Sequence, residues 1–222
     1  ISSGWNHGGS LDNTEIIDLR SGKTFHMAPL AKRTHGATGG LLDGLPVIVG
    51  GHDDRQIHSI AKDQSKFLGQ LTATRDMAAS VVLSNNTLWV TGGLDQSWNR
   101  LKTTEFVTKE GKTSKGPDLP LAVYGHAIVA LNRGVFILIG GSSDDDPWSS
   151  ATYFYEEKKG WRPGPNLKNG RFRHTAGVLT DRVSTKQYIV VVGGLDEYFS
   201  VEYLEYPGSN EWMKGKQSHF KV

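Results

Sequence analysis

Four stretches of the chain share one pattern, an apolar run that ends in a glycine doublet: LPVIVGG (45–51), LWVTGG (88–93), VFILIGG (135–141) and YIVVVGG (188–194). ISSG (1–4) is a degenerate fifth copy in which Ser3-Gly4 replaces the glycine doublet. The second residue of each doublet lies at position 4, 51, 93, 141 or 194, so the spacings are 47, 42, 48 and 53 residues. Such a steady period indicates a repeat architecture in which each repeat is one supersecondary unit.

Four further elements follow the doublets in a fixed order. A loop of variable length leads to a strand opened by Thr-Glu or a relative, as at 14–17, 104–107, 151–154 and 201–204. A short strand with a large aromatic residue comes next, at Phe25, Phe67, Trp161 and Trp212, and then a Leu or Pro segment. An Arg/His signature at 33–37, 75–79, 124–127 and 173–176 then opens another strand.

This order of elements resembles the kelch repeat, and the resemblance covers essentially the whole chain. It implies an all-β fold, a kelch-type β-propeller built from four-stranded antiparallel blades. Paired glycines permit positive φ and close backbone approach at the strand ends. The Trp or Phe of the outer strand is expected to fill the wedge between neighbouring blades, which assigns this role to Trp161 and Trp212 and also to Phe25 and Phe67. The glycines assigned this structural role are Gly50, Gly51, Gly92, Gly93, Gly140, Gly141, Gly193 and Gly194.

The phase of the repeat predicts four complete blades and a partial one within a single kelch domain or segment. The partial blade occupies residues 1–27, the complete blades 34–71, 75–116, 124–164 and 173–214, and residues 218–222 begin another. Kelch propellers usually close with six or seven blades, so the expected fold is part of such a ring. Open strand edges are a liability, and we expect missing sequence or another chain to supply the remaining blades.

Two repeats depart from the pattern. The second has Ser59-Ile60 in place of Thr-Glu and Met77-Ala78 at the position of the histidine, and the third has Thr113 at the position of the aromatic residue. The third also carries Tyr124 where Arg is expected. These changes affect the expected packing of two blades and leave the predicted fold unchanged.

The loops that join the second and third strands of the blades are expected on one face, where binding residues concentrate. Four of the five loops contain a large aromatic residue, and each adds an acid or amide. Aromatic and Arg side chains are enriched at binding hot spots. The alternative is that Trp98 and Trp148 fold back onto their own blades. The candidate ligand- or partner-binding residues are Trp5, Asp53, Arg55, Trp98, Arg100, Asp145, Trp148, Arg171, Tyr198 and Phe199.

The arginines divide into two groups. Arg33, Arg75 and Arg173 fit the repeat consensus, which predicts structural ion pairs. Arg100 and Arg171 are predicted to face an acidic peptide or a carboxylated sugar.

Composition excludes several classes of protein. The 222 residues carry 25 Lys and Arg against 23 Asp and Glu, and this formal charge of +2 disfavours a nucleic-acid binder. The longest apolar runs, such as 135–139 and 188–192, are far shorter than the ~20 residues that span a bilayer. The absence of Cys excludes disulfides, thiolate zinc sites and cysteine nucleophiles.

Several groups of residues could suggest a metal site or an active site, but each lacks the pattern that such a site requires. Asp144-Asp145-Asp146 lacks the spacing of an EF-hand and is expected to be a solvated turn. His35, His126 and His174 are assigned to one phase of different blades, which predicts a repeated structural role in place of a metal site. Copper radical oxidases need a Cys, and the Asp-box of sialidases is absent. We therefore expect no catalytic residue, no metal and no cofactor.

The sequence predicts a non-catalytic binding scaffold whose partner is a protein. The alternatives are a carbohydrate-binding or sugar-active kelch propeller similar to sialic acid mutarotases, and a structural assembly module. Asn85 begins an N-glycosylation sequon at an expected hairpin tip, which favours secretion, although the cytoplasm stays open.

Overall fold

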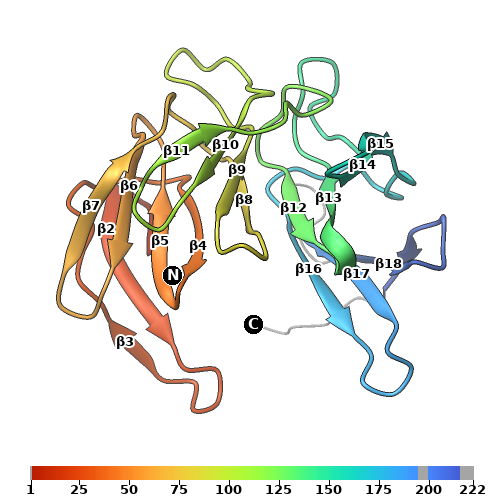
Figure 1. The fold of residues 1–222 in the computed structure, drawn as a ribbon, viewed down its shortest axis with the longest axis horizontal. Helices are drawn as coiled ribbons and strands as arrows, with labels where there is room; N and C mark the ends of the chain where they lie inside the picture. The colour runs from red at the N-terminus through yellow and green to blue at the C-terminus, as the bar shows by residue number, and fades with distance from the viewer. Residues whose placement is uncertain (1, 195–199, 216–222) are drawn as a thin grey trace. The chain divides into compact units, whose positions relative to one another are not determined.

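The computed structural model describes residues 2–194 and 200–215, and in this range the protein is all-β (Figure 1). Within these residues nineteen strands form five small antiparallel sheets, and Asn132–Gly134 is a short 3-10 helix. The chain divides into two compact units, Ile1–Leu119 and Pro120–Val222. None of the described residues forms a helix with the length and apolarity that spanning a bilayer requires.

The first unit contains three sheets. The first sheet has three strands and the other two have four, each in sequence order. The bounds are β1 Ser2–Asn6, β2 Gly9–Ile17 and β3 Thr24–His26; β4 Thr38–Leu42, β5 Leu45–Val49, β6 Gln56–Ile60 and β7 Ser65–Gln70; β8 Ala79–Val82, β9 Leu88–Thr91, β10 Thr104–Val107 and β11 Thr113–Lys115.

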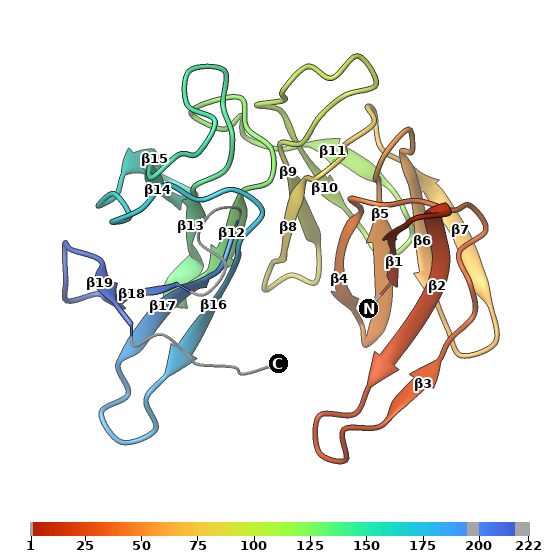
Figure 2. The same ribbon diagram turned by 180° about the vertical axis from the view of Figure 1, so that it is seen from behind.

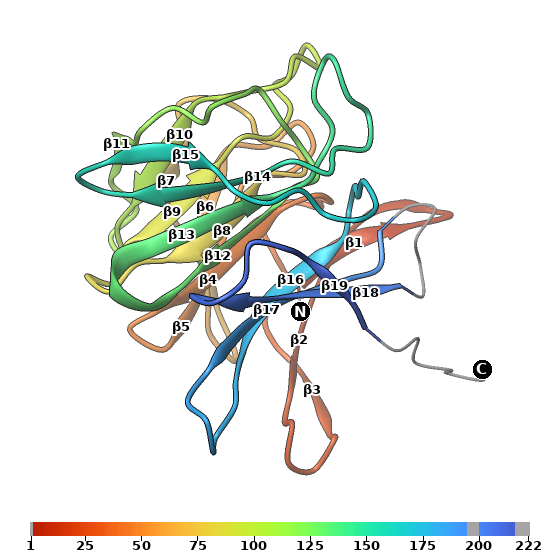
Figure 3. The same ribbon diagram turned by 90° about the vertical axis from the view of Figure 1, so that its right-hand side faces the viewer.

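The second unit contains two four-stranded sheets, and the strands of the β12–β15 sheet can be followed in sheet order in Figure 3. The bounds are β12 Ala127–Ala130, β13 Val135–Ile139, β14 Thr152–Glu156 and β15 Gly160–Pro163; β16 Thr175–Thr180, β17 Gln187–Val192, β18 Val201–Tyr206 and β19 Met213–Lys214. The described sheets therefore match the predicted four complete blades and one partial blade of three strands.

Neighbouring sheets within a unit pack through their first strands, as the blades of a propeller do. In the first unit β4 lies beside β8, and in the second β12 lies beside β16 (Figures 1 and 2). Alternate residues of the central strands are buried between sheets, such as Val47 and Val49 in the first unit and Ile137 and Ile139 in the second. Each unit therefore has an apolar core of its own.

The glycine doublets act as the sequence predicts. All eight doublet glycines have positive φ. At Gly51 (φ +113°) a Cβ atom would lie 2.2 Å from Oγ1 of Thr34 and 2.8 Å from the carbonyl oxygen of His35. The end of this strand can therefore lie against the Thr34–His35 segment only if the residue at position 51 has no side chain.

The aromatic residues of the outer strands do not all fill wedges. Trp212 is fully buried, and its Nε1 donates a hydrogen bond to the carbonyl oxygen of Pro165 in the neighbouring sheet, 2.8 Å away. Trp161 is half-buried against Tyr155. Phe25 and Phe67 are 52% exposed, so the wedge interpretation is wrong for these two.

Trp5 lies in a strand, and the prediction that it belongs to a loop is wrong. It pairs with Ser10 in the β1–β2 hairpin, whose turn shrinks to His7-Gly8. The side chain of Asn6 accepts a hydrogen bond from the backbone N–H of Gly8, which closes this tight turn. The Trp5 side chain is nevertheless 65% exposed.

Candidate binding surface

Two predicted loops of the first unit lie together. The loop after β5 contributes residues 53–55 and the loop after β9 contributes residues 95–97 to the lining of a polar groove of about 610 Å³. Asp53 and Arg55 come from the first loop and Asp95 from the second, while Lys32 adds a further positive charge. The groove therefore presents both signs of charge to a ligand.

The second of these loops is held by its own hydrogen bonds. Oδ1 of Asp95 accepts hydrogen bonds from the backbone N–H groups of Ser97 and Asn99, at 2.8 and 2.9 Å. The Asn99 side chain donates a hydrogen bond to Oδ2 of Asp95. This bond has the largest effect in lowering the pKa of Asp95, and the backbone hydrogen bonds lower it further. The loop is thus a preformed turn.

Trp98 is the fourth residue of this turn, and its backbone N–H donates a hydrogen bond to the carbonyl oxygen of Asp95. Its φ is +63°, which is unusual for a bulky residue and commonly marks a functional position. The side chain is 60% exposed, and its ring lies 5.2 Å from the ring of His52 in the neighbouring loop. His52 lies in a loop of the neighbouring sheet, so this ring contact points away from the alternative in which Trp98 folds back onto its own blade.

Besides Asp95, four charged residues lie in the same loops. Asp53 and Arg55 are exposed, and the backbone carbonyl of Asp53 accepts a hydrogen bond from Nζ of Lys32 at 2.7 Å. Asp54 is buried and accepts a hydrogen bond from the backbone N–H of Gln56. Arg100 is half-buried and pairs through its backbone with Leu94.

The corresponding loop of the second unit is a self-capped acidic turn. The Oγ atom of Ser143 accepts a hydrogen bond from the backbone N–H of Asp146, as expected for a turn. Asp145 is exposed, and Trp148 is 49% exposed. These two side chains remain candidate binding residues of the second unit. Tyr198 and Phe199 lie outside the described residues.

Arg171 is not a surface residue, and the prediction that it faces a partner is wrong. Its side chain is fully buried, and Nη2 donates to Oε1 of Glu202 at 2.9 Å. Nη1 donates to the carbonyl oxygen of Gly193 at 2.6 Å. Arg171 is therefore the structural arginine of its repeat.

The repeat phase corrects this assignment. The residue two positions after the structural arginine has positive φ in every complete blade: Gly36, Met77, Gly125 and Arg173. Arg171 thus corresponds to Arg75, which is also buried and donates from Nε to Oε1 of Glu105 at 3.0 Å. Arg75 is structural as predicted. Arg33 and Arg173 are exposed, and Nε of Arg33 lies 3.6 Å from Oδ2 of Asp12, so Arg33 does form an ion pair at the surface.

The same phase separates the three histidines that the sequence grouped together. His126 and His174 share one position, three residues after that of the structural arginine, while His35 lies one residue after it. Burial, reinforced by His174, lowers the pKa of His126 to about 3. Burial and the charge of Arg171 lower the pKa of His174 to about 4. Both histidines are neutral at physiological pH.

Asn85 occupies the predicted hairpin tip between β8 and β9 and is exposed. Its neighbour Asn86 adopts positive φ and donates a hydrogen bond to Asp43 at the tip of the β4–β5 hairpin. The sequon is therefore accessible, and glycosylation stays a prediction.

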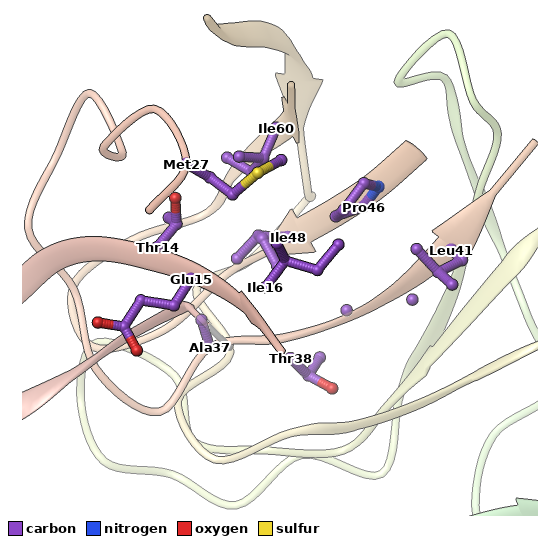
Figure 4. Close-up of a pocket in the computed structure, with 12 residues that line it drawn as sticks. Thr14, Glu15, Ile16, Met27, Ala37, Thr38, Leu41, Pro46, Ile48 and Ile60 are labelled. Atoms are coloured by element: carbon purple, nitrogen blue, oxygen red, sulfur yellow. The ribbon is translucent and has the colours of Figure 1, made fainter. Parts of the chain in front are cut away.

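An apolar hollow of about 410 Å³ lies between the first two sheets (Figure 4). Ile16, Ile48 and Met27 line it, and the carboxylate of Glu15 points away from the isoleucines. Sequence reasoning did not predict this hollow because it depends on how two sheets pack.

Comparison with known proteins supports the repeat assignment. No family model matches the sequence. Over 117 residues, 51% of this chain, the sequence is 32% identical to Kelch-like protein 41b of Danio rerio. Over 98 residues, 42% of the chain, it is 33% identical to Kelch-like protein 41a of the same species. The chain is similar to Kelch-like proteins.

This similarity is distant and partial. The matched segments span 18% and 15% of the length of the two Kelch-like proteins. Together with the five sheets, the glycine doublets and the repeat period, it confirms the recognition of kelch repeats. It does not single out a member.

Proposed function

We propose that this kelch protein is a non-catalytic scaffold that binds a protein partner through the loop surface of its first unit. The observation that carries the proposal is Trp98, a large exposed ring at positive φ on a turn closed by Asp95. A preformed aromatic anchor loses little conformational entropy on binding. Trp and Arg are the residue types most enriched at binding hot spots, and Arg55 lies in the adjoining groove.

The test is quantitative capture of partners by the full chain and by single variants. Trp98→Ala should weaken the recovered interaction by about 30-fold or more, because hot-spot residues contribute ~2 kcal/mol or more. Arg55→Ala should weaken it to a smaller extent. Leu179→Ala is the matched control, since Leu179 is 63% exposed on the β16–β17 hairpin of the other unit.

The proposal is abandoned if partners bind Trp98→Ala and Arg55→Ala as tightly as they bind the unchanged protein. Circular dichroism of each variant separates a lost contact from a lost fold.

A carbohydrate ligand is the second candidate. The groove combines Arg55 with Asp53 and Asp95. An Arg side chain can pair with the carboxylate of a sugar, and Asp side chains can accept hydrogen bonds from its hydroxyl groups. Binding of the full chain to an array of sialylated and neutral glycans separates the two functions. Saturable binding of a glycan that Arg55→Ala abolishes would favour the carbohydrate ligand.

A further inference from the structure

Three side chains of the first unit converge beside Trp98. His35, His52 and Asp76 each offer one ligand atom, and these atoms lie within 4.8 Å of one another. Nδ1 of His52 lies 3.5 Å from Oδ2 of Asp76. Two ligands of one tetrahedral zinc ion, each at 2.0–2.2 Å, lie roughly 3.3–3.5 Å apart. The His52–Asp76 separation is therefore the one that a shared zinc ion sets.

Asp76 is the decisive member. Its side chain is 5% exposed, and neither carboxylate oxygen accepts a hydrogen bond within the described part of the chain. A buried carboxylate without hydrogen bonds is costly, and buried charges are normally paired or bound to metal. A Cβ atom at Gly36 would lie 1.8 Å from Oδ1 of Asp76, so glycine makes room for the carboxylate.

The same repeat positions hold different side chains in the second unit. His35 and Asp76 correspond to Tyr124 and Phe172, because each lies one residue before a positive-φ position. The rings of Tyr124 and Phe172 pack edge to face at 4.9 Å and fill the space between their sheets. In the first unit, imidazole and carboxylate groups replace this apolar pair.

Neighbouring residues orient both imidazoles. Nδ1 of His35 lies 2.9 Å from Oγ of Ser10, a contact that leaves Nε2 of His35 available to a metal. Nε2 of His52 lies 3.5 Å from Oδ2 of Asp53, which leaves Nδ1 of His52 directed at Asp76. Metal-ligating histidines typically have such an outer partner, which fixes their tautomer and ring orientation.

We propose that His35, His52 and Asp76 form a divalent transition-metal site, with Zn²⁺ as the ion that this ligand set suits best. Two imidazoles and one carboxylate are a zinc ligand set that leaves the fourth tetrahedral position for water. The His35 and His52 rings are 4.7 Å apart, so closing the triad requires only a small side-chain movement. This site goes beyond the proposed binding function and does not depend on it.

The test is titration of the EDTA-treated full chain with Zn²⁺ by calorimetry and with Co²⁺ by visible absorption. We expect one site with a Co²⁺ spectrum typical of tetrahedral coordination. Asp76→Asn and His52→Ala should each weaken Zn²⁺ binding by about 100-fold or more. Ser10→Ala should weaken it by about 10-fold, in the range seen for outer-shell partners.

His26→Ala is the matched control, because the His26 side chain is 82% exposed and lies outside the triad. The control should bind Zn²⁺ as the unchanged protein does. Zn²⁺ should also change the tryptophan fluorescence through the His52–Trp98 contact. Trp98→Phe should abolish that change while leaving the calorimetric affinity intact.

The proposal would be overturned if the protein does not bind Zn²⁺ at concentrations of tens of micromolar, or if Asp76→Asn and His52→Ala bind Zn²⁺ as tightly as the unchanged protein does. Circular dichroism of the metal-free variants shows that they fold. Because partner capture in EDTA tests the binding surface alone, failure of one proposal is distinguishable from failure of the other.

Discussion

Arg75 and Arg171 occupy one position in two repeats and meet the same partner. Glu105 and Glu202 accept their guanidinium hydrogen bonds and are themselves buried. Each glutamate also accepts a backbone N–H of the preceding loop, from Thr72 in one case and Lys168 in the other. The ion pair therefore fastens a loop to the third strand of the blade.

The other two complete blades lack both members of the pair. The arginine position holds Thr34 or Val123, and the glutamate position holds His58 or Tyr153. This correlation follows from electrostatics, because one buried charge without its partner is far more costly than none.

The correlation leads to a prediction about Arg171. Arg171→Met should destabilise the protein by about 3–5 kcal/mol, since it leaves Glu202 buried and unpaired. Adding Glu202→Gln should recover part of this loss, because glutamine carries no charge and still accepts the loop N–H groups. Denaturant unfolding of the single and double variants measures both values.

The matched control is Arg173→Ala. Arg173 is exposed and lies over the ring of Phe172, a contact worth ~0.5–1 kcal/mol at exposed sites. A loss at Arg171 no larger than the loss at Arg173 would contradict the structural role.

At the scale of the strand and its turn, the doublet glycines are needed for two reasons, positive φ and close contact with neighbouring atoms, and substitutions can separate the two. Gly51 has positive φ and lies against the Thr34 side chain and the His35 backbone, whereas Gly44 has φ +78° with nothing within 4 Å of a built Cβ atom. Gly44→Ala should therefore cost only the left-handed backbone penalty, about 1–2 kcal/mol.

Gly51→Ala should cost about 1–3 kcal/mol more than Gly44→Ala, because overpacking adds this amount to the backbone penalty. Thermal and denaturant unfolding of the two variants gives the difference. Equal losses would show that the doublet is needed only for its φ angles.

Much of the fold follows from such local signals. The doublets and the apolar strands before them predict four complete sheets, because strand alternation and positive φ are properties of short segments. The assignment of Arg171 and Arg173 failed because two arginines two residues apart fit the same motif. The burial of Arg171 and the positive φ of Arg173 separate them in the structure.

The candidate surface was predicted in part. The loops of Asp53 and Trp98 do lie on one groove, as their shared repeat phase suggests. His52 and Asp76 were missed because their convergence depends on contacts between sheets. A signal was available, since polar residues stand at repeat positions where the other blades have Tyr124 and Phe172.

At the scale of the whole molecule, the two units have separate apolar cores, and the second unit also contains two buried histidines. His126 and His174 belong to the second unit, and burial holds their pKa values near 3 and 4, against 6.5 when unfolded. The unfolded state therefore binds more protons between these values, so the stability of the unit rises with pH in this window.

Stability is fully present above pH 6.5 and declines as the pH falls toward the folded pKa values. Between pH 7 and pH 5 the two histidines should each cost at most about 2 kcal/mol, since one pKa unit corresponds to 1.36 kcal/mol. Denaturant unfolding followed through the second unit measures this loss, and Trp212, fully buried there, is a suitable probe. His126→Gln with His174→Gln should remove most of the pH dependence of the second unit, whereas His26→Ala in the first should leave it unchanged. An undiminished acid loss in the double variant would assign the sensitivity to other groups.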